Sequence, residues 1–412
     1  MNFKFILFYI AGFLLLYLEP IELVAGFTFG IIWKLVLMMI LFFPILYRVL
    51  RVKKIELFAL FSILLAFKIL ISYSSLDYFS NTITLFTKEM MFPMLFLFFS
   101  QKVKNESTLY FIIRHFSIVI ILSFLPYMFG LLEPFSLGYA LAEFGHEGEY
   151  GLIGPFIKPH SASVMTSFAM IVITTSIKKE NSLYLNLFYV ALLVLGFYEL
   201  IAMYVRTGIA IYIAVLIYLY LREISLKKIL LLMLTSAVLV GAVAYLYQTN
   251  DIVQMRIDDK NKYSKKSSHG SGGSGRLLFW KNAIDNWLDD EPIVIYIGLG
   301  EEYAKEKMYE DVGLHIFAHN HFIQMLQQEG IIGFLFFITY MFLIYRYIQR
   351  YKKSDYFVAT NALFLGIIIE MLFQGGFFFP PVLFLSASLV ILKLNALKNK
   401  KYSMLKKDLN VN

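Results

Sequence analysis

Long apolar runs separated by short polar connections make up most of this chain. A membrane-spanning helix needs about 20 predominantly apolar residues, with a usual range of about 17–25. Twelve segments approach or reach that length, near residues 4–18, 27–47, 55–73, 81–99, 109–131, 161–177, 183–204, 207–221, 228–247, 321–345, 356–373 and 378–395. The first and the eighth are short for a span. The pattern predicts an all-α polytopic membrane protein with about 12 transmembrane helices.

Lysine and arginine are concentrated in alternate connections, which indicates the orientation of the chain because cytoplasmic loops carry an excess of both. The opposite short connections 19–26 and 73–80 contain neither, and 132–160 contains only Lys158. We therefore predict that both termini are cytoplasmic. The basic side holds Arg48, Arg51, Lys53, Lys54, Lys102, Lys104, Lys178, Lys179, Arg222, Lys227, Lys228, Arg346, Arg350, Lys352, Lys353 and the lysines of the C-terminal tail.

Two connections on the side opposite to the basic loops are long, namely 132–160 and 248–318. A loop beyond about 12–15 residues without secondary structure of its own is usually functional or disordered. Within the longer one, Leu277–Leu288 is predicted to be a helix with Trp280 and Trp287 on one face, and the glycine- and serine-rich stretch before it is flexible by composition. The predicted divisions are helices 1–9 with an extracytoplasmic loop at 132–160 (1–247), a large extracytoplasmic loop with short helices (248–318), helices 10–12 (319–395) and a basic cytoplasmic tail (396–412).

Composition agrees with a membrane protein and excludes several kinds of site. The chain is 59% hydrophobic and 16% charged, with a mean hydropathy of +0.68, whereas soluble domains are about 45–50% apolar and about 25% charged. It contains no cysteine, which excludes disulfides, thiolate zinc sites, iron–sulfur clusters and cysteine nucleophiles. Most of the net charge of +8 lies on the predicted cytoplasmic side, so it does not indicate nucleic-acid binding.

Two arginines on the predicted extracytoplasmic side are candidates for binding an anion. Arg206 lies between two predicted spans, where an ionisable group is either functional or a snorkelling anchor of a helix end. Arg276 follows the glycine- and serine-rich stretch and begins the predicted loop helix. Backbone N–H groups, the helix N-terminus and the planar guanidinium there suit phosphate. The alternative for Arg276 is a solvated side chain at the end of a flexible linker.

His319 and Asn320 directly precede the tenth predicted span. A histidine at this position can act as a general base near neutral pH, and Asn320 suits the N-cap of the helix. The alternative is a histidine that only caps or packs. Together with His315 and His321, His319 also raises the possibility of a metal site. Their spacing does not fit one helical face and no fourth ligand stands out, so we expect no metal and no cofactor.

Further polar residues lie at the mouth of the sixth span and within spans. His160 and Lys158 are candidates for holding an anion, and the alternative is that Pro159 and Ser161 only start the helix. Ionisable groups inside a membrane should face protein or water. The following residues would suit either proton-coupled transport or structural pairing between spans: Lys34, Lys68, Lys88, Glu89, Glu199 and Glu370.

The pattern His-Asn-x-x-x-Gln-x-Leu-x-x-x-Gly-x-x-Gly at 319–333 resembles the hallmark of the O-antigen polymerase and O-antigen ligase superfamily. Three other motifs precede it in the family's order. Arg206-Thr207-Gly208 resembles the family's Ser-Arg-Thr/Gly segment between two spans, with Val205 in place of the serine. Residues 274–281 resemble the Gly-Arg-aromatic entry to the large periplasmic loop, and 297–300 resemble the Gly-x-Gly that follows. The correspondence covers about 200–345.

This resemblance implies a C-type glycosyltransferase-like fold in the bacterial inner membrane, with the active site facing the periplasm. It also implies glycans carried on undecaprenyl diphosphate, diphosphate binding by Arg206 and Arg276, and activation of the acceptor by His319 without a metal. Asn320, His160, Lys158 and Trp280 are further candidates for substrate binding. The expected partners are the undecaprenyl-diphosphate-linked oligosaccharide, membrane lipids and a chain-length regulator protein.

The function favoured on this basis is that of a polymerase. Such an enzyme transfers glycan from undecaprenyl diphosphate to the terminal sugar hydroxyl of another lipid-linked repeat unit, with inversion. The length and mixed charge of loop 248–318 favour it over an O-antigen ligase, which transfers glycan to the lipid A core. A polysaccharide transporter or flippase is the alternative from another class. Transporters commonly show paired halves and helices broken at the midplane, which we do not find in this sequence.

Overall fold

The computed structural model of the protein describes residues 3–24, 27–30, 32–34, 36–37, 39–41, 55–133, 151–156, 159–177, 179–203, 205–221, 241, 248–249, 276–313, 315–373 and 379–409. Its elements are α1 (Phe3–Leu18), β1 (Glu22–Val24), β2 (Phe27–Thr28), α3 (Leu57–Ile69), α4 (Phe79–Lys102), α5 (Glu106–Leu122), α6 (Leu125–Met128), α8 (Pro159–Ile177), α9 (Leu183–Ala202), α10 (Arg206–Leu221), α13 (Arg276–Leu288), α14 (Pro292–Ile297), α15 (Glu301–Val312), α16 (His321–Arg350), α17 (Phe357–Phe373) and α18 (Phe379–Leu409).

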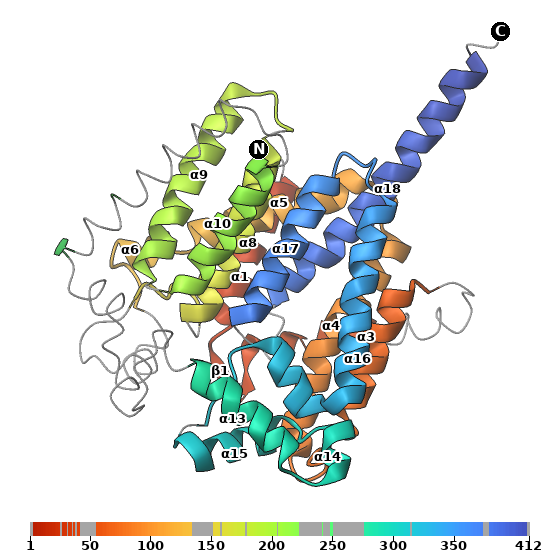
Figure 1. Ribbon diagram of the computed structural model, residues 1–412. Coiled ribbons are helices and arrows are strands. Elements are labelled where there is room, and N and C mark those ends of the chain that lie inside the picture. The colour runs from red at the N-terminus through yellow and green to blue at the C-terminus, as the bar shows by residue number, and fades with distance from the viewer. Residues whose placement is uncertain are drawn as a thin grey trace.

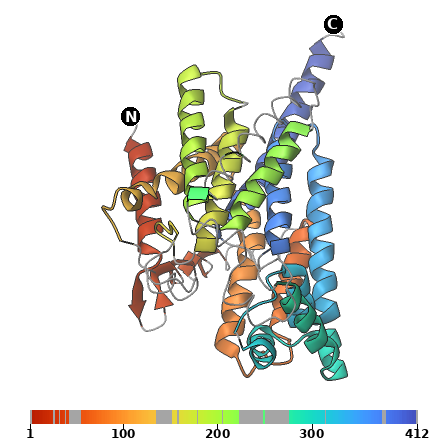
Figure 2. The ribbon, with the colours of Figure 1, turned by 60° about the vertical axis from the view of Figure 1, so that its left-hand side comes forward.

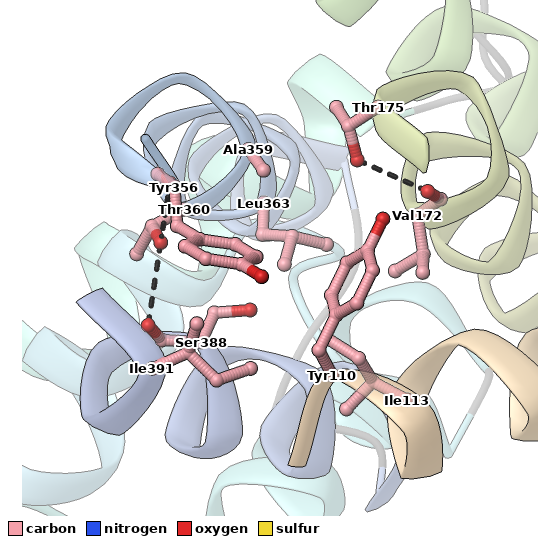
Figure 3. Close-up of a pocket in the computed structure, with 10 residues that line it drawn as sticks. All are labelled: Tyr110, Ile113, Val172, Thr175, Tyr356, Ala359, Thr360, Leu363, Ser388 and Ile391. Atoms are coloured by element: carbon pink, nitrogen blue, oxygen red, sulfur yellow. Dashed lines mark hydrogen bonds between the residues drawn. The ribbon is translucent and has the colours of Figure 1, made fainter. Parts of the chain in front are cut away.

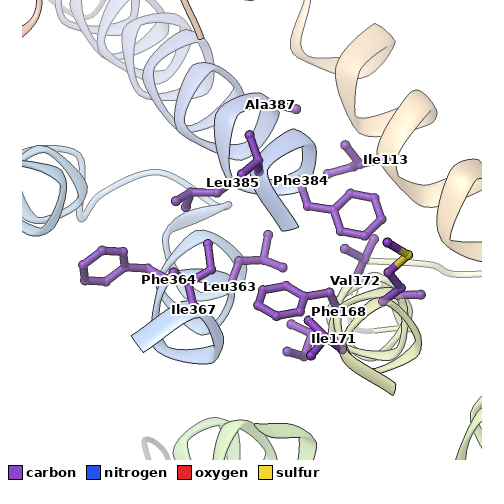
Figure 4. Packing of buried hydrophobic residues seen from close by; sticks show 14 of the residues in the cluster. Ile113, Phe168, Ile171, Val172, Leu363, Phe364, Ile367, Phe384, Leu385 and Ala387 are labelled. Atoms are coloured by element: carbon purple, nitrogen blue, oxygen red, sulfur yellow. The ribbon is translucent and has the colours of Figure 1, made fainter. Parts of the chain in front are cut away.

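The long helices form one bundle (Figure 1). In it α3 packs against α4 and α16, and α8 packs against α5, α9, α10 and α17. Phe168 of α8, Leu363 of α17 and Phe384 of α18 belong to the same buried apolar cluster (Figure 4). Six described helices are long and apolar enough to cross a membrane: Asn81–Lys102, Glu106–Met128, Pro159–Ile177, Leu183–Ala202, His321–Arg350 and Pro381–Lys400. The chain is therefore a multi-pass membrane protein.

The described helices agree with most of the predicted segments, although the number twelve is not established. Shorter apolar helices include Leu57–Ile69, Arg206–Leu221 and Phe357–Phe373, and the ninth predicted segment lies outside the described residues except for position 241. The all-α prediction is confirmed, and the only strands among the described residues, β1 and β2, form a short antiparallel hairpin at the start of the second apolar segment. α18 also continues as helix beyond the expected end at residue 395, to Leu409.

The helices of the large loop lie at one end of the bundle. Figures 1 and 2 show α13, α14 and α15 together at the lower end, whereas α1 begins and α18 ends at the upper end. The predicted loop helix Leu277–Leu288 is confirmed as α13, and the glycine- and serine-rich stretch before it lies outside the described residues. The described parts of the large loop and the two termini thus lie at opposite ends of the molecule.

The tenth predicted span is interrupted at Gly330, where φ is 64° and ψ is −172°. The ring centroids of His321 and Phe337 lie 5.0 Å apart, although 16 residues of straight helix would separate them by about 24 Å at about 1.5 Å per residue. The segment His321–Glu329 therefore folds back against the helix that follows Gly330. We call this segment the short helix of α16.

Backbone packing explains why the bend occurs at a glycine. Residues Ile297–Gly300 lie in the bend, where Leu299 and Gly300 donate backbone hydrogen bonds of 2.9 Å to the carbonyls of Gln327 and Gln328. A Cβ atom at Gly330 would lie 2.4 Å from the carbonyl oxygen of Tyr296. The φ and ψ of Gly330 also fall in a region that is essentially restricted to glycine. Gly298 of the Gly-x-Gly motif thus lies against Gly330, the first glycine of the Gly-x-x-Gly motif, at this bend.

Replacing Gly330 by alanine should sharply reduce the amount of folded protein, because the new side chain meets backbone in a conformation that alanine rarely adopts. The matched control is Gly313→Ala. Gly313 has φ 71° and ψ 24°, the ordinary left-handed region, and open space around its Cβ position, so the cost there should be about 1–2 kcal/mol. Fluorescence-detected size-exclusion chromatography of both variants measures the difference. Equal recovery of the two would contradict the proposed packing of the bend.

Candidate functional site

Arg206 and His160 begin adjacent helices at the loop end of the bundle. Arg206 is the first residue of α10 and its side chain is exposed, whereas His160 is the second residue of α8 and is half-buried. The first turns of these helices approach closely because Gly208 has no side chain: a Cβ atom there would lie 1.9 Å from Oγ of Ser163. Lys158, the other candidate at this mouth, lies outside the described residues.

The position of Arg206 relative to Arg276 follows from the end of α17. Asn361, near the start of α17, donates a hydrogen bond of 2.7 Å to Tyr218, near the end of α10, so the two helices run antiparallel. Arg206 precedes Tyr218 by twelve residues and Phe373 follows Asn361 by twelve, a rise of about 18 Å along each helix. Arg206 and Phe373 thus lie at the same level. The guanidinium carbon of Arg276 lies 5.9 Å from the ring centroid of Phe373, which places both arginines at this level.

His319 lies beside the arginine-bearing helix α13. The ring centroid of Phe279, three residues after Arg276, is 6.3 Å from that of His319. His319 is half-buried and has φ 52°, the one positive value at a non-glycine residue among those described. A positive φ is uncommon for a residue with a side chain and is often found at functional sites. It turns the chain sharply before the short helix of α16 begins.

Asn320 caps that short helix, as predicted from its residue type. Its side-chain oxygen accepts hydrogen bonds from the backbone N–H groups of Phe322, at 3.0 Å, and Ile323, at 3.3 Å. Asn320 is also buried, with 8% of its surface exposed. The cap stabilises the first turn of the helix and so limits the movement of His319, which directly precedes it.

Asn320→Ala should lower the thermal stability of the purified protein, because loss of an N-cap costs about 0.5–2 kcal/mol. Asn320→Ser supplies another capping oxygen and should restore most of that loss. The measurement is the thermal denaturation midpoint of each variant in detergent. A serine variant as stable as wild type but as inactive in glycan transfer as the alanine variant would instead assign the amide to substrate binding.

The tryptophans of the loop have different environments. Trp287 is 9% exposed and donates a hydrogen bond to the carbonyl of Ile295 at 3.3 Å, so it packs inside the loop rather than facing a sugar. Trp280 is half-buried beside the apolar cluster that contains Phe279 and Ala318. Its indole nitrogen is buried and has no hydrogen-bond partner among the described residues. Trp280 therefore stays a candidate for substrate binding.

The three neighbouring histidines do not converge. The His315 ring stacks on Tyr309 with centroids 4.6 Å apart, His319 lies near Phe279, and His321 is buried against Phe337. Within the described residues, no group of three histidine, aspartate or glutamate side chains is arranged to hold a metal ion.

A buried ion pair is the main feature of this region that the sequence alone did not reveal. Lys68 of α3 lies 3.2 Å from Oε2 of Glu329 in the short helix, and the two residues are 5% and 0% exposed. Lys34 pairs with Glu19. The structure therefore shows structural pairing for two of the predicted intramembrane charges. The one hint in the sequence was the position of Glu329, because a charged residue inside an apolar helical pattern is expected to need a buried partner.

A small pocket lies away from the candidate site. It is lined by Tyr110, Thr175, Tyr356, Thr360 and Ser388, together with apolar residues of α5, α8, α17 and α18 (Figure 3). Thr175 is near the end of α8, whereas His160 is at its start. The pocket therefore lies at the end of the bundle opposite to the arginines and His319.

The fold and the placement of the polar residues define a multi-pass membrane protein with a candidate site at one membrane face. Residues 189–338 match the family described as O-antigen ligase. The resemblance of the sequence motifs to the O-antigen polymerase and ligase superfamily is thereby confirmed for this part of the chain. No curated protein matches the chain. The matched region includes Arg206, Arg276 and His319, and it supports an enzyme role of the O-antigen ligase or polymerase type.

Proposed function

We propose that this protein is a polymerase of a bacterial surface polysaccharide in the cytoplasmic membrane, with its active site at the periplasmic face. It transfers glycan from undecaprenyl diphosphate to the terminal sugar hydroxyl of another lipid-linked repeat unit. The supporting observation is the placement of Arg206 and Arg276 at one level, with His319 beside the helix that Arg276 begins. Both termini, at the opposite end of the bundle, would be cytoplasmic, in agreement with the distribution of basic residues.

The proposed chemistry is a direct displacement at the anomeric carbon. The acceptor oxygen forms a bond to that carbon while the bond to the diphosphate oxygen breaks, so the configuration inverts. The leaving diphosphate is anionic and requires charge stabilisation, which Arg206 and Arg276 would supply. Each charge-assisted hydrogen bond contributes about 1.5–3 kcal/mol. His319 would take the proton of the acceptor hydroxyl, which is a poor nucleophile.

Purified protein tests this proposal directly. Incubated with undecaprenyl-diphosphate-linked repeat units, it should produce a ladder of longer lipid-linked glycans and release undecaprenyl diphosphate. Lipid-linked units that stay single would contradict the proposal. The reaction should also proceed in the presence of a chelator.

A ligase is the second candidate, because the matched family is described as O-antigen ligase. The two functions differ in the acceptor. Deletion of a polymerase should leave one repeat unit on the lipid A core, whereas deletion of a ligase should leave the core without glycan while lipid-linked chains accumulate. Gel analysis of surface polysaccharide distinguishes these outcomes.

A further inference from the structure

The buried pair Lys68–Glu329 lies where three separate segments of the chain meet. Lys68 donates a hydrogen bond of 2.7 Å to the carbonyl of Ile297 as well as contacting Glu329 at 3.2 Å. Its ammonium group therefore joins the end of α3 to the segment Ile297–Gly300 and to the short helix of α16. The proposed reaction makes no direct use of either charged side chain.

Backbone hydrogen bonds extend this junction on both sides. Tyr73 and Ser74, which follow α3, donate to the carbonyls of Gly298 at 2.9 Å and Leu299 at 3.2 Å. On the other side, the backbone N–H groups of Leu299 and Gly300 donate to the short helix. The segment Ile297–Gly300 is thus hydrogen-bonded along both of its edges, and Lys68 binds the carbonyl of its first residue, Ile297.

The junction is connected to both parts of the candidate site. The short helix begins at His321, directly after the cap Asn320 and His319, and ends at Glu329. Ile297–Gly300 leads into α15, and Met308 of α15 packs in one apolar cluster with Phe279 of α13. A shift at the junction would therefore change the position of His319 relative to Arg276.

A buried ion pair is a poor source of stability, because the cost of desolvating two charges offsets their attraction. Removal of one partner is nevertheless very unfavourable, since it leaves an unpaired buried charge. Glu89 of α4, 5% exposed, is close enough to Glu329 to interact with it electrostatically, so a second buried carboxyl group lies near the junction. A pair with these properties is better suited to fixing one arrangement of the three segments than to increasing the stability of the protein.

We propose that Lys68 is a positioning residue: through Glu329 and the carbonyl of Ile297 it holds the short helix of α16, and with it His319, in register with Arg276. The inference rests on the proposed function only where it assigns His319 to the reaction. Its structural part concerns the placement of the short helix and can be measured without any substrate.

The test uses Lys68→Met/Glu329→Gln in the full-length protein, because the double change leaves neither partner as an unpaired charge and should fold. We expect a denaturation midpoint close to that of wild type and an unchanged KM for the lipid-linked repeat unit. The value of kcat should fall about 10- to 100-fold, since a displacement of about 1 Å can cost about 10²-fold. Amide hydrogen exchange should become faster in 297–300 and 321–329.

The matched control is Lys398→Met/Glu106→Gln, which removes an interhelical pair of 2.8 Å at the far end of the bundle and should change neither kcat nor exchange in 321–329. Wild-type kcat and exchange in the Lys68 and Glu329 double variant would overturn the positioning role. If wild-type protein transfers no glycan, the proposed function fails, and hydrogen exchange still decides whether the pair positions the short helix.

Discussion

Replacing His319 by alanine is expected to abolish polymer formation while the protein remains folded in the membrane. A general base typically contributes about 10²–10⁴-fold to a reaction rate, and a sugar hydroxyl reacts slowly without one. The side chain is half-buried at the surface of the loop end, with its ring centroid 6.3 Å from that of Phe279. The measurement is the rate of chain extension by purified protein, compared at equal amounts of folded enzyme.

His315→Ala provides the matched control for this result. His315 precedes His319 by four residues and is exposed, with its ring stacked on Tyr309, and its removal should leave the rate unchanged. His319→Ala protein that extends chains at the normal rate would end the assignment of the base. Loss of activity in both variants would instead indicate that the whole segment before the short helix is sensitive.

Arg276→Lys should cause the second large loss, although it keeps the positive charge. Arginine presents a planar fork that can bind two phosphate oxygens, whereas lysine offers a compact point charge. Loss of one charge-assisted hydrogen bond of about 1.5–3 kcal/mol corresponds to a fall of about 10- to 100-fold in kcat/KM. Steady-state kinetics with the lipid-linked donor measures this fall.

Arg350→Lys is the control for the arginine substitution. Arg350 ends α16 at the far end of the bundle, is 67% exposed and lies 3.9 Å from Glu56, so its replacement should have little effect. Normal kinetics of the Arg276→Lys variant would show that bidentate binding at this position is not required. A loss of folded protein in that variant alone would indicate that the contact with Phe373 is structural.

Periodicity and residue type were sufficient to predict the local structure. Apolar runs predicted the bundle helices, the pattern after the glycine- and serine-rich stretch predicted α13, and the side chain of Asn320 predicted the cap. Each of these properties depends on neighbouring residues in the chain. The order of the sequence motifs along the chain also indicated the resemblance that the family match supports.

Features that depend on distant contacts could not be predicted in this way. A glycine within a helical pattern usually costs only about 1 kcal/mol, so Gly330 alone does not indicate a bend. The bend requires Ile297–Gly300, which belongs to another part of the loop. Likewise, Lys68 and Glu329 are 261 positions apart, and each appears in the sequence only as an isolated charge. The roles of Arg206, Arg276 and His319 remain predictions for the experiments above.

The length of α18 has a consequence for how the protein meets the lipid headgroups. Its 31 residues extend about 46 Å at about 1.5 Å per residue, whereas the hydrocarbon layer is about 30 Å thick. In the proposed orientation, the helix would project past the inner leaflet and carry Lys398 and Lys400 at the level of the headgroups. Lysines near an anionic surface contribute about 1 kcal/mol each. Acidic phospholipids should therefore retain this end of the protein and set the depth of the bundle in the bilayer.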